Sequence, residues 1–249
     1  MDTATTASAA PDSRTDAHRL ADEGARFVAV ADSGALGKLD VSRAVLGWAR
    51  EALGPELVAL SSMADEAMVH LAGQVIPGID VAFLDTGRHF AETLQIRDTM
   101  AARLEINLIN VEPIVSVAEQ DARFGPELHL TNPDQCCKLR KLEPLNRILG
   151  RYRGWVTGVR RVDAPTRAGT ELVEYDARRD MLKINPLVFW DDDDLANYVE
   201  EFSVPQHPLR ALGYPSIGCE PCTRAPAPGE DPRSGRWAGT GKTECGLHI

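Results

Sequence analysis

Short apolar runs alternate with amphipathic stretches through the first half of the chain. Short, largely apolar runs predict a buried strand at Leu57–Ser61 and further strands at Val81–Asp85 and Ile106–Val111. Apolar residues at helical spacing predict helices at about Ser42–Leu53, Asp65–Ala72 and Phe90–Arg103. Strands that alternate with helices in this way predict an α/β fold, with a mostly parallel sheet flanked by helices.

The loops after the predicted strands are where such a sheet binds its ligand. Ser61-Ser62, Asp85-Thr86-Gly87 and the residues after Val111 all lie in these loops. We therefore expect the functional site to draw on all of them.

The second half of the chain predicts fewer elements. One helix is predicted over Asn132–Leu149, with Asn132 as its N-cap and Pro133 at its first position. Strands are predicted at Gly154–Arg161 and Lys183–Phe189. A helix is predicted at Asp191–Phe202, and the carboxylates of Asp191–Asp194 are expected to form its solvated first turn at the positive end of the helix dipole.

Composition divides the chain into three parts. Residues 1–25 are rich in Ala, Thr, Ser and Asp, which predicts a disordered tail. Residues 26–222 carry the strand and helix pattern and are expected to form one α/β domain. Residues 223–249 are rich in Pro and Gly, so we expect a loop-rich, mobile C-terminal arm.

The bulk composition restricts the class of protein. The 249 residues are 43% hydrophobic and 26% charged, as is ordinary for a soluble globular protein. No apolar run is long enough to span a bilayer, and the first residues lack the features of a signal peptide. We therefore expect a cytoplasmic protein without membrane association, whose cysteines stay reduced.

The charge pattern points to a small anionic ligand. The net charge of −10 argues against a nucleic-acid partner, because binding to a phosphate backbone requires a basic face. Basic residues nevertheless crowd the centre of the chain, at Lys138, Arg140, Lys141, Arg147, Arg151, Arg153, Arg160 and Arg161. A local basic pocket in an acidic protein suits a small anion far better than a polyanion.

Five cysteines fall into three groups: Cys136-Cys137, Cys219-Glu-Pro-Cys222 and the single Cys245. The two pairs together can hold a 4Fe–4S cluster or a zinc ion, and adjacent cysteines suit a cluster better because each sulfur can reach a different iron. A redox role for the Cys-x-x-Cys segment would leave Cys136-Cys137 unexplained. A buried, inert Cys136 or Cys137 is the plainer alternative.

The fifth cysteine has no partner left in the chain. Lys242 and His248 flank Cys245, and Arg233 and Arg236 are close in sequence. Positive charge favours the thiolate and attracts an anion, so Cys245 is a candidate nucleophile. The alternatives are a stray terminal thiol and a solvated basic turn at Arg233–Arg236. His70 and His89 are expected to be ordinary helix or loop residues.

Several segments taken together resemble one known family. They are Cys136-Cys137-x-x-Arg140-Lys141, Gly213-Tyr-Pro-Ser-Ile-Gly-Cys219-x-Pro-Cys222, Gly235-Arg236-Trp237, Lys242-x-Glu-Cys245-Gly-Leu-His248, Leu84-Asp85-Thr86-Gly87 and Thr157-Gly158-x-Arg160-Arg161. From about Leu57 to Ile249 the chain resembles the assimilatory adenylyl-sulfate (APS) reductases, the iron–sulfur branch of the phosphoadenylyl-sulfate (PAPS) reductase family.

The resemblance implies that residues 26–222 form a nucleotide- and cluster-binding α/β domain, and it also implies a set of site residues. The fold is the adenine-nucleotide α-hydrolase-like sheet, and a 4Fe–4S cluster is held by Cys136, Cys137, Cys219 and Cys222. The implied substrate contacts are Lys141, Arg233, Arg236, His248, Ser61, Ser62 and Leu84, with the serines in a phosphate-binding loop and Leu84 against the adenine. That loop reads Ser61-Ser-Met-Ala-Asp-Glu-Ala67, whereas iron–sulfur members usually have Phe and Gly or Gln after the serines, then Ala-Glu-Asp.

The resemblance also implies a reaction in sulfate assimilation and cysteine biosynthesis. The Cys245 thiolate attacks the sulfate sulfur of APS and expels AMP, which leaves S-sulfocysteine on the enzyme. Because the other four cysteines ligate the cluster, an external dithiol must release sulfite, and thioredoxin is the expected partner. The implied roles of the cluster are structural and electrostatic.

Three other functions stay open on the sequence alone. The first is a PAPS reductase with the same thiol chemistry, although members that prefer PAPS generally lack both cysteine pairs. The second is a non-catalytic iron–sulfur, nucleotide-binding protein that senses oxygen or binds a partner. The third is a nucleotide-binding module with a zinc site. The sequence does not specify the oligomeric state, and a homo-oligomer stays open.

Overall fold

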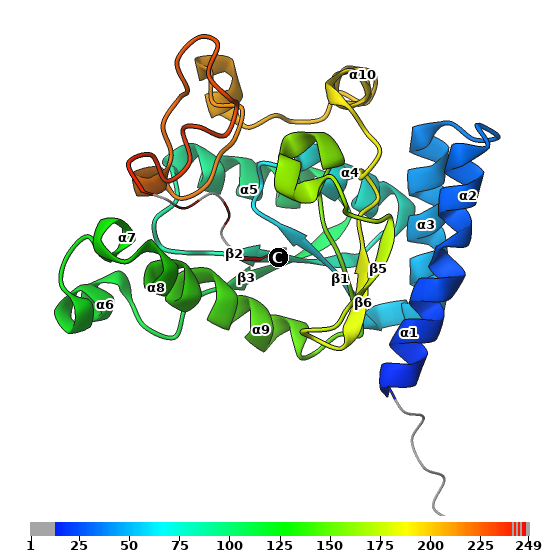
Figure 1. The fold of residues 1–249 in the computed structure, drawn as a ribbon, viewed down its shortest axis with the longest axis horizontal. Helices are drawn as coiled ribbons and strands as arrows, with labels where there is room; N and C mark the ends of the chain where they lie inside the picture. The colour runs from blue at the N-terminus through cyan, green and yellow to red at the C-terminus, as the bar shows by residue number, and fades with distance from the viewer. Residues whose placement is uncertain (1–12, 241, 243, 245, 248–249) are drawn as a thin grey trace, which may run out of the picture.

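A six-stranded sheet forms the centre of the protein (Figure 1). The structure is a computed structural model that describes residues 13–240, 242, 244, 246 and 247. The strands are β1 Leu57–Ser61, β2 Ile79–Leu84, β3 Ile106–Val111, β4 Gly154–Val156, β5 Val173–Asp176 and β6 Met181–Ile184. Their order is β3-β2-β1-β4-β6-β5, and all neighbours pair in parallel except β5 with β6. The predicted mostly parallel sheet is confirmed.

Helices cover both faces of this sheet (Figure 1). They are α1 Ser13–Gly24, α2 Arg26–Asp32, α3 Lys38–Leu53, α4 Glu66–Val75, α5 Ala91–Arg103, α6 Val117–Phe124, α7 Leu128–Thr131, α8 Pro133–Cys137, α9 Glu143–Leu149 and α10 Asp192–Glu201. No described helix has the length and apolar character needed to cross a membrane.

Strand β1 shows how both faces of the sheet are buried. Successive strand residues point to opposite sides of a sheet. Leu57 and Ala59 belong to the larger core, which includes residues of α3, α4 and α10. Val58 and Leu60 belong to a second core with Leu145 of α9. Burial on both sides explains the continuous apolar run that predicted this strand.

Two predicted strands are shorter than expected. The strand predicted over Gly154–Arg161 ends at Val156, because the chain then turns into the cleft, where a Cβ on Gly158 would lie 2.8 Å from Cβ of Asp65. The strand predicted over Lys183–Phe189 is β6, which ends at Ile184. Pro186 follows it and cannot donate a ladder hydrogen bond.

The disordered tail predicted for residues 1–25 is wrong for its described part. Residues 13–24 form α1, and Ala17 and Leu20 are buried. The ring of His18 lies 3.7 Å from the ring of Tyr175 in β5, centroid to centroid. The tail has few apolar residues of its own, but the short polar strand β5, which the sequence analysis missed, provides a surface for it. Residues 1–12 lie outside the described part.

The helix predicted over Asn132–Leu149 is interrupted by a π-helical turn at Lys138–Leu142, between α8 and α9. The predicted N-cap is confirmed, since the Asn132 side chain accepts a hydrogen bond from the backbone N–H of Gln135. An α-helix would need Pro144 to donate to the carbonyl of Arg140, which proline cannot do. Single π-helical turns of this kind are frequent at functional sites.

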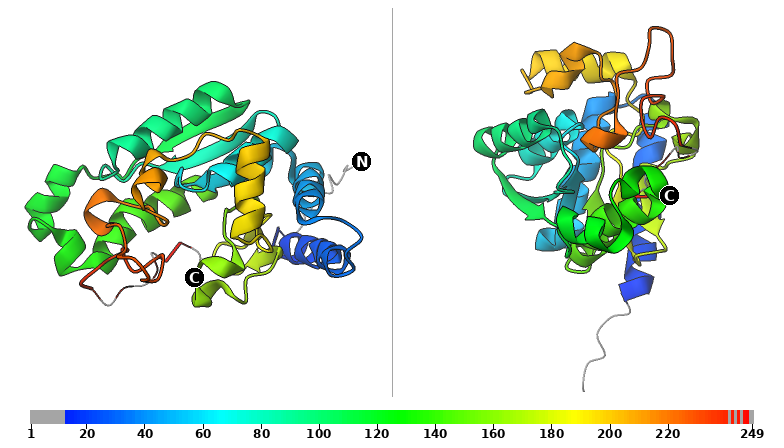
Figure 2. Two further views of the ribbon diagram at one scale, coloured as in Figure 1. Left: turned by 90° about the horizontal axis from the view of Figure 1, so that it is seen from above. Right: turned by 90° about the vertical axis from the view of Figure 1, so that its left-hand side faces the viewer.

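After α10 the described chain contains only single 3-10 turns, at Pro208–Leu212 and Glu220–Cys222. Thr223 and Arg236 pair in an isolated antiparallel bridge, which folds the C-terminal segment back on itself. The views in Figure 2 place this orange and red segment on the same side of the molecule as α8. The expected loop-rich character of the segment is therefore confirmed, while its mobility stays a prediction.

Candidate active site

A cleft of about 2780 Å³, counting its space open to solvent, lies at the carboxyl ends of the strands. Strand β1 has β2 on one side and β4 on the other, so the connections leave it in opposite directions. Such a switch point is the usual ligand site of an open parallel sheet. Ser61 at the end of β1, Leu84 at the end of β2 and Gly158 beyond β4 all line the cleft.

The structure brings most of the predicted substrate-binding residues together. The six that line this cleft are Ser61, Ser62, Leu84, Lys141, Arg233 and Arg236. They come from β1, β2, the π-helical turn and the C-terminal segment, which are far apart in the sequence. Cys245 and His248 lie outside the described residues, so their predicted roles stay predictions.

The two serines of the loop after β1 lie in different surroundings. The buried Ser61 donates a hydrogen bond of 2.6 Å from Oγ to Oδ1 of Asp65 and accepts one of 2.9 Å from the N–H of Met63. Met63 is fully buried and has a left-handed φ of 58°. Ser61 therefore braces the loop from within, whereas Ser62 is exposed in the cleft.

Asp65 is a half-buried ionisable group that lines this cleft. Burial of its carboxyl group raises the pKa of Asp65 to about 6, although the hydrogen bond from Ser61 opposes that rise. The loop after β1 therefore carries a carboxyl group that titrates near neutral pH.

Four cysteines surround a second, smaller cavity beside the cleft. Cys136, Cys137, Cys219 and Cys222 line it together with Arg88, His129 and Trp237. Cys136 and Cys137 end α8, while Cys219 forms an isolated bridge with His89, just beyond β2. The two cysteine pairs, which the sequence predicted to form one metal site, therefore lie around the same cavity.

The donor set suits a multi-iron cluster better than a single ion. Among the described residues, no three His, Cys, Asp or Glu side chains converge closely enough to hold one metal ion. A cluster bound through four thiolates gives each iron its own sulfur, so the sulfurs lie around a cavity rather than around a point. Two buried nitrogens on that cavity, Arg88 Nε and His129 Nδ1, have no hydrogen-bond partner among the described residues.

Lys141 lines both the cysteine cavity and the cleft. Burial alone raises the pKa of the Cys219 thiol, but the charges of Lys141 and Arg236 and the Thr86 hydroxyl outweigh burial and lower that pKa. By contrast, burial and the neighbouring Cys219 raise the pKa of Cys222 to about 12. The cation at Lys141 thus influences both sites.

Arg236 is held close against the backbone that precedes Cys219. Its Nη1 donates to the carbonyl of Ile217 at 3.1 Å and to Oγ of Ser216 at 3.3 Å. A Cβ on Gly218 would lie 2.1 Å from Nη2 of Arg236. Gly218 therefore leaves room for a guanidinium group, and its backbone φ is not left-handed.

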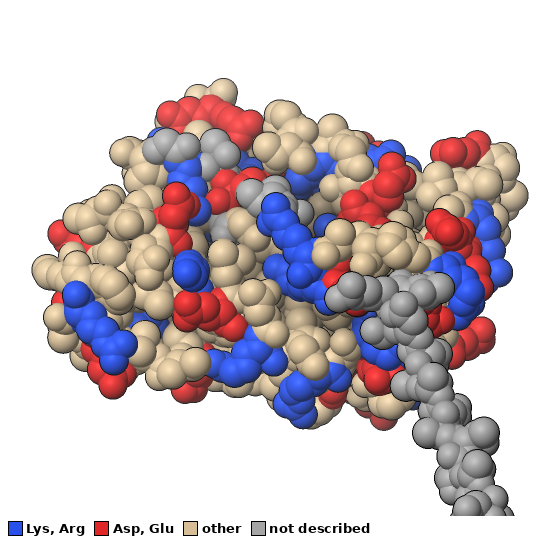
Figure 3. Space-filling view, turned by 60° about the horizontal axis from the view of Figure 1, so that its bottom comes forward, with Lys and Arg blue, Asp and Glu red and all other residues tan. Residues whose placement is uncertain are grey.

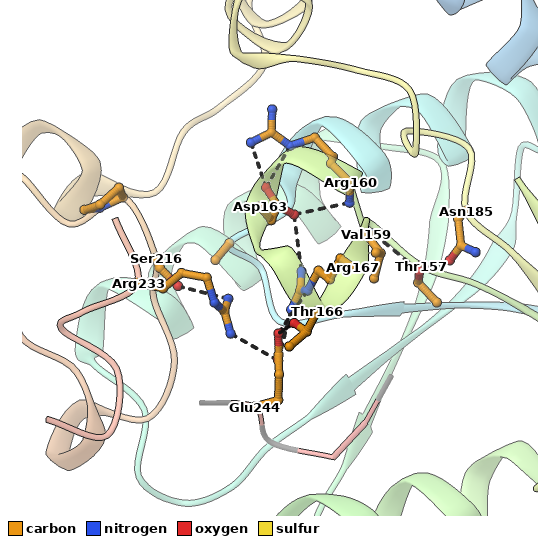
Figure 4. A network of polar contacts seen from close by, with 12 residues as sticks. Thr157, Val159, Arg160, Asp163, Thr166, Arg167, Asn185, Ser216, Arg233 and Glu244 are labelled. Atoms are coloured by element: carbon orange, nitrogen blue, oxygen red, sulfur yellow. Dashed lines mark hydrogen bonds and ion pairs between the residues drawn. The ribbon is translucent and has the colours of Figure 1, made fainter. Parts of the chain in front are cut away.

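Glu244 and Leu247, two described residues on either side of Cys245, line the cleft. Lys242 forms an ion pair with Asp134 in α8. Glu244 lies between Arg167 and Arg233 (Figure 4). Leu247 packs against the second core, which contains Leu84. The described residues of this terminal segment (242, 244, 246 and 247) therefore reach from α8 to the core beside Leu84, the residue predicted to contact the adenine.

The central run of basic residues does not form one pocket as predicted. Lys141 and Arg160 line the cleft. Arg140 is buried and donates to Gln120, Thr86 and Val115. Arg147 donates to the carbonyl of Glu112, and Arg153 pairs with Glu56 and Asp16. On the face drawn in Figure 3, basic and acidic side chains are interspersed.

Other cleft cations come from segments that the sequence analysis did not single out. Arg167 and Arg210 line the cleft beside the predicted Arg233 and Arg236. Glu244, which pairs with Arg167, entered the sequence analysis only as part of the terminal motif. No periodicity or spacing in the sequence links Arg167 to Glu244.

Comparisons with known proteins agree with this geometry. Residues 56–225 match the sequence profile of the phosphoadenosine phosphosulfate reductase domain. An adenosine 5'-phosphosulfate reductase from Rhodococcus opacus (strain B4) is 50% identical over 218 residues, covering 84% of this chain and 88% of that protein. One from Streptomyces coelicolor is 50% identical over 204 residues, covering 82% of this chain and 86% of that protein.

Solved structures give the same fold. A phosphoadenylyl-sulfate reductase from Candida auris, solved as a phosphate complex, superposes with a TM-score of 0.62 at 28% identity and covers 74% of this chain and 90% of its own. An FMN adenylyltransferase from Candida glabrata has a TM-score of 0.56 at 12% identity, covers 84% of this chain and 71% of its own, and shares the fold alone. The chain belongs to the phosphoadenosine phosphosulfate reductase family.

Proposed function

We propose that the protein is an oxidoreductase that reduces APS to sulfite and AMP in cytoplasmic sulfate assimilation. The observation that carries this proposal is the position of Lys141, which lines both the four-cysteine cavity and the cleft at the switch point of the sheet. A nucleotide-binding fold, a cationic cleft and relatives named adenosine 5'-phosphosulfate reductase support the same activity.

We propose a 4Fe–4S cluster held by Cys136, Cys137, Cys219 and Cys222. Four thiols around one cavity support this choice, as do Arg88 Nε and His129 Nδ1, which find no hydrogen-bond partner in the described part of the chain. When bound, such a cluster supplies a rigid support for both cysteine segments and an electrostatic field at the edge of the cleft.

The substrate would lie along the cleft with its two ends recognised differently. Leu84, beside Leu60, offers an apolar surface for the adenine. Lys141, Arg233 and Arg236 offer the positive charge that a sulfate–phosphate group requires. The same cations would stabilise charge that develops on the leaving phosphate. His248 is proposed to join them.

The chemistry would need one thiol of this chain and one external dithiol. The Cys245 thiolate attacks the sulfate sulfur, an S–S bond forms, the bond from sulfur to the phosphate oxygen breaks, and AMP leaves with that electron pair. A thioredoxin thiolate then attacks the Cys245 sulfur and releases sulfite. The second thioredoxin thiol resolves the mixed disulfide, so thioredoxin is oxidised as sulfur is reduced.

Sulfite release tests this function. Anaerobically purified protein is incubated with thioredoxin and either APS or PAPS, and sulfite is measured over time. We expect rapid release from APS and slow release from PAPS. Faster turnover of PAPS would identify the protein as a PAPS reductase instead, and no sulfite from either nucleotide would contradict both assignments.

A further inference from the structure

Glu244 is the most firmly held of the described residues next to Cys245. Its carboxylate accepts hydrogen bonds from Arg167 Nε at 3.2 Å, from Arg167 Nη2 at 3.3 Å and from Arg233 Nη2 at 3.1 Å. Thr166 adds a fourth, from Oγ1 at 3.2 Å. One carboxylate thus joins the terminal segment to two other parts of the cleft (Figure 4).

Arg167 is a fixed anchor for this carboxylate. Its Nη1 donates to Oδ2 of Asp163 at 3.2 Å, and Asp163 in turn accepts two hydrogen bonds from the guanidinium of Arg160. These residues form the two 3-10 turns at Arg161–Asp163 and Pro165–Arg167, which follow β4. The loop after the switch point therefore presents Arg167 to the terminal segment in a set orientation.

Burial makes this ion pair stronger than an ordinary surface pair. The side chains of Glu244, Arg167 and Arg233 are only 8%, 14% and 16% exposed. Burial opposes ionisation of Glu244, but Arg167, Arg233 and Thr166 outweigh it and lower the pKa of the carboxyl group. Exposed pairs contribute little because water and salt screen them. Removing one partner of a buried pair leaves the charge of the other partner buried and uncompensated.

We propose that Glu244 is a positioning residue that fixes the terminal segment in the cleft, with Arg167 as its anchor and Arg233 as a shared partner. The importance of this position for catalysis rests on the proposed function, in which the adjacent Cys245 is the nucleophile. Arg233 is both a neighbour of Glu244 and a proposed contact of the substrate anion. Glu244 therefore sets where the thiol-bearing segment lies and, at the same time, competes with the substrate for Arg233.

Limited proteolysis tests the anchoring without any substrate. Trypsin cleavage after Lys242 is followed by mass spectrometry in the full-length protein and in Glu244→Gln, which keeps the side-chain shape but removes the charge. We expect cleavage to be about tenfold faster in the variant, as for an anchoring contact weakened by about 1.4 kcal/mol. The control is Glu230→Gln, because Glu230 pairs with Arg224 in the same segment but is 40% exposed. Cleavage of Glu244→Gln at the control rate would overturn the proposal.

A double-mutant cycle tests the choice of Arg167 as anchor. Arg167→Gln should accelerate cleavage to a similar degree, and the double variant should be no faster than either single variant, because both remove one contact. Independent, multiplicative effects of the two substitutions would contradict a shared contact.

Kinetics separates positioning from a general loss of structure. In Glu244→Gln the rate at saturating APS should fall about tenfold, while KM should stay the same or decrease because Arg233 no longer shares its charge with a carboxylate. Glu244→Asp should recover part of the rate. An increased KM with an unchanged rate would overturn the positioning role. The proteolysis experiment needs no APS. A wild-type protein without APS reductase activity would therefore refute the proposed function, while the anchoring by Glu244 could still be measured.

Discussion

Ser61 donates a 2.6 Å hydrogen bond to Asp65 inside the loop that follows β1. This contact spans a loop whose sequence departs from the usual pattern of iron–sulfur APS reductases. It keeps the Ser61 hydroxyl engaged within the protein and leaves a carboxyl group with a pKa of about 6 at the cleft. The ionised Asp65 carboxylate therefore lowers the free energy of unfolding by an amount that depends on pH.

Asp65→Asn should stabilise the protein at high pH. The folded-state pKa of about 6 lies above the ordinary value of 3.8, so the unfolded chain ionises more readily. Folding is therefore penalised fully above about pH 6 and not at all well below pH 4. The difference corresponds to up to ~3 kcal/mol at pH 8 and roughly half of that at pH 5.

Urea unfolding of wild type and Asp65→Asn at pH 8 and pH 5 measures this difference. Asp22, which is exposed on α1, provides the matched control, and Asp22→Asn should leave stability unchanged at both values. A variant destabilised equally at pH 8 and pH 5 would show that the carboxylate is needed rather than tolerated.

Gly218→Ala should displace Arg236, because the new methyl group would lie 2.1 Å from its Nη2. We expect KM for APS to increase about tenfold as the guanidinium loses its position, with a stability loss of ~1–3 kcal/mol typical of overpacking. The control is Gly169→Ala, where nothing lies within 4 Å of the added Cβ. Wild-type KM in Gly218→Ala would show that Arg236 does not need this position.

Arg140→Gln should destabilise the fold, although Arg140 is not one of the proposed substrate contacts. Arg140 is buried and donates hydrogen bonds of 2.8, 3.0 and 3.2 Å to Gln120, Thr86 and Val115. Loss of these bonds leaves buried acceptors unpaired, at a cost of ~2–4 kcal/mol. Thermal unfolding measures the effect, and the exposed Lys138 supplies the control in Lys138→Gln. Equal stability of the two variants would contradict a structural role for Arg140.

Cys222→Ser should abolish iron binding, because only three of the four cavity thiols remain. Iron and acid-labile sulfide are expected to disappear together, along with the visible absorption of the cluster. Cys245→Ser should retain both, since Cys245 is not one of the proposed ligands. Stoichiometric zinc without sulfide in the wild-type protein would instead support the zinc-site alternative.

Strong local patterns explain why much of the fold was predictable. The short, largely apolar runs of β1 and β3 predicted their observed bounds, because β1 is buried throughout and β3, an edge strand, pairs with β2 along its whole length. The N-cap at Asn132 and the acidic first turn of α10 are local features and were predicted from the sequence.

Contacts between distant segments explain what was missed. Helix α1 depends on β5 and β6, so its own composition wrongly indicated disorder. The pairing of Arg167 with Glu244 arises only after β4 and the terminal segment meet across the cleft. The four cysteines of the two pairs line one cavity, and their spacing indicated this because adjacent cysteines and a Cys-x-x-Cys segment restrict the chemistry before any fold is known. The metal centre that they hold stays a prediction.

The covalent intermediate tests the central claim most directly. The protein is mixed with APS in the absence of thioredoxin, and its mass and tryptic peptides are measured. We predict one added sulfonate group on the peptide that contains Cys245, removed by thioredoxin as sulfite appears and absent in Cys245→Ser. Sulfite formation at the full rate in Cys245→Ser, or a sulfonate group on another residue, would contradict the account.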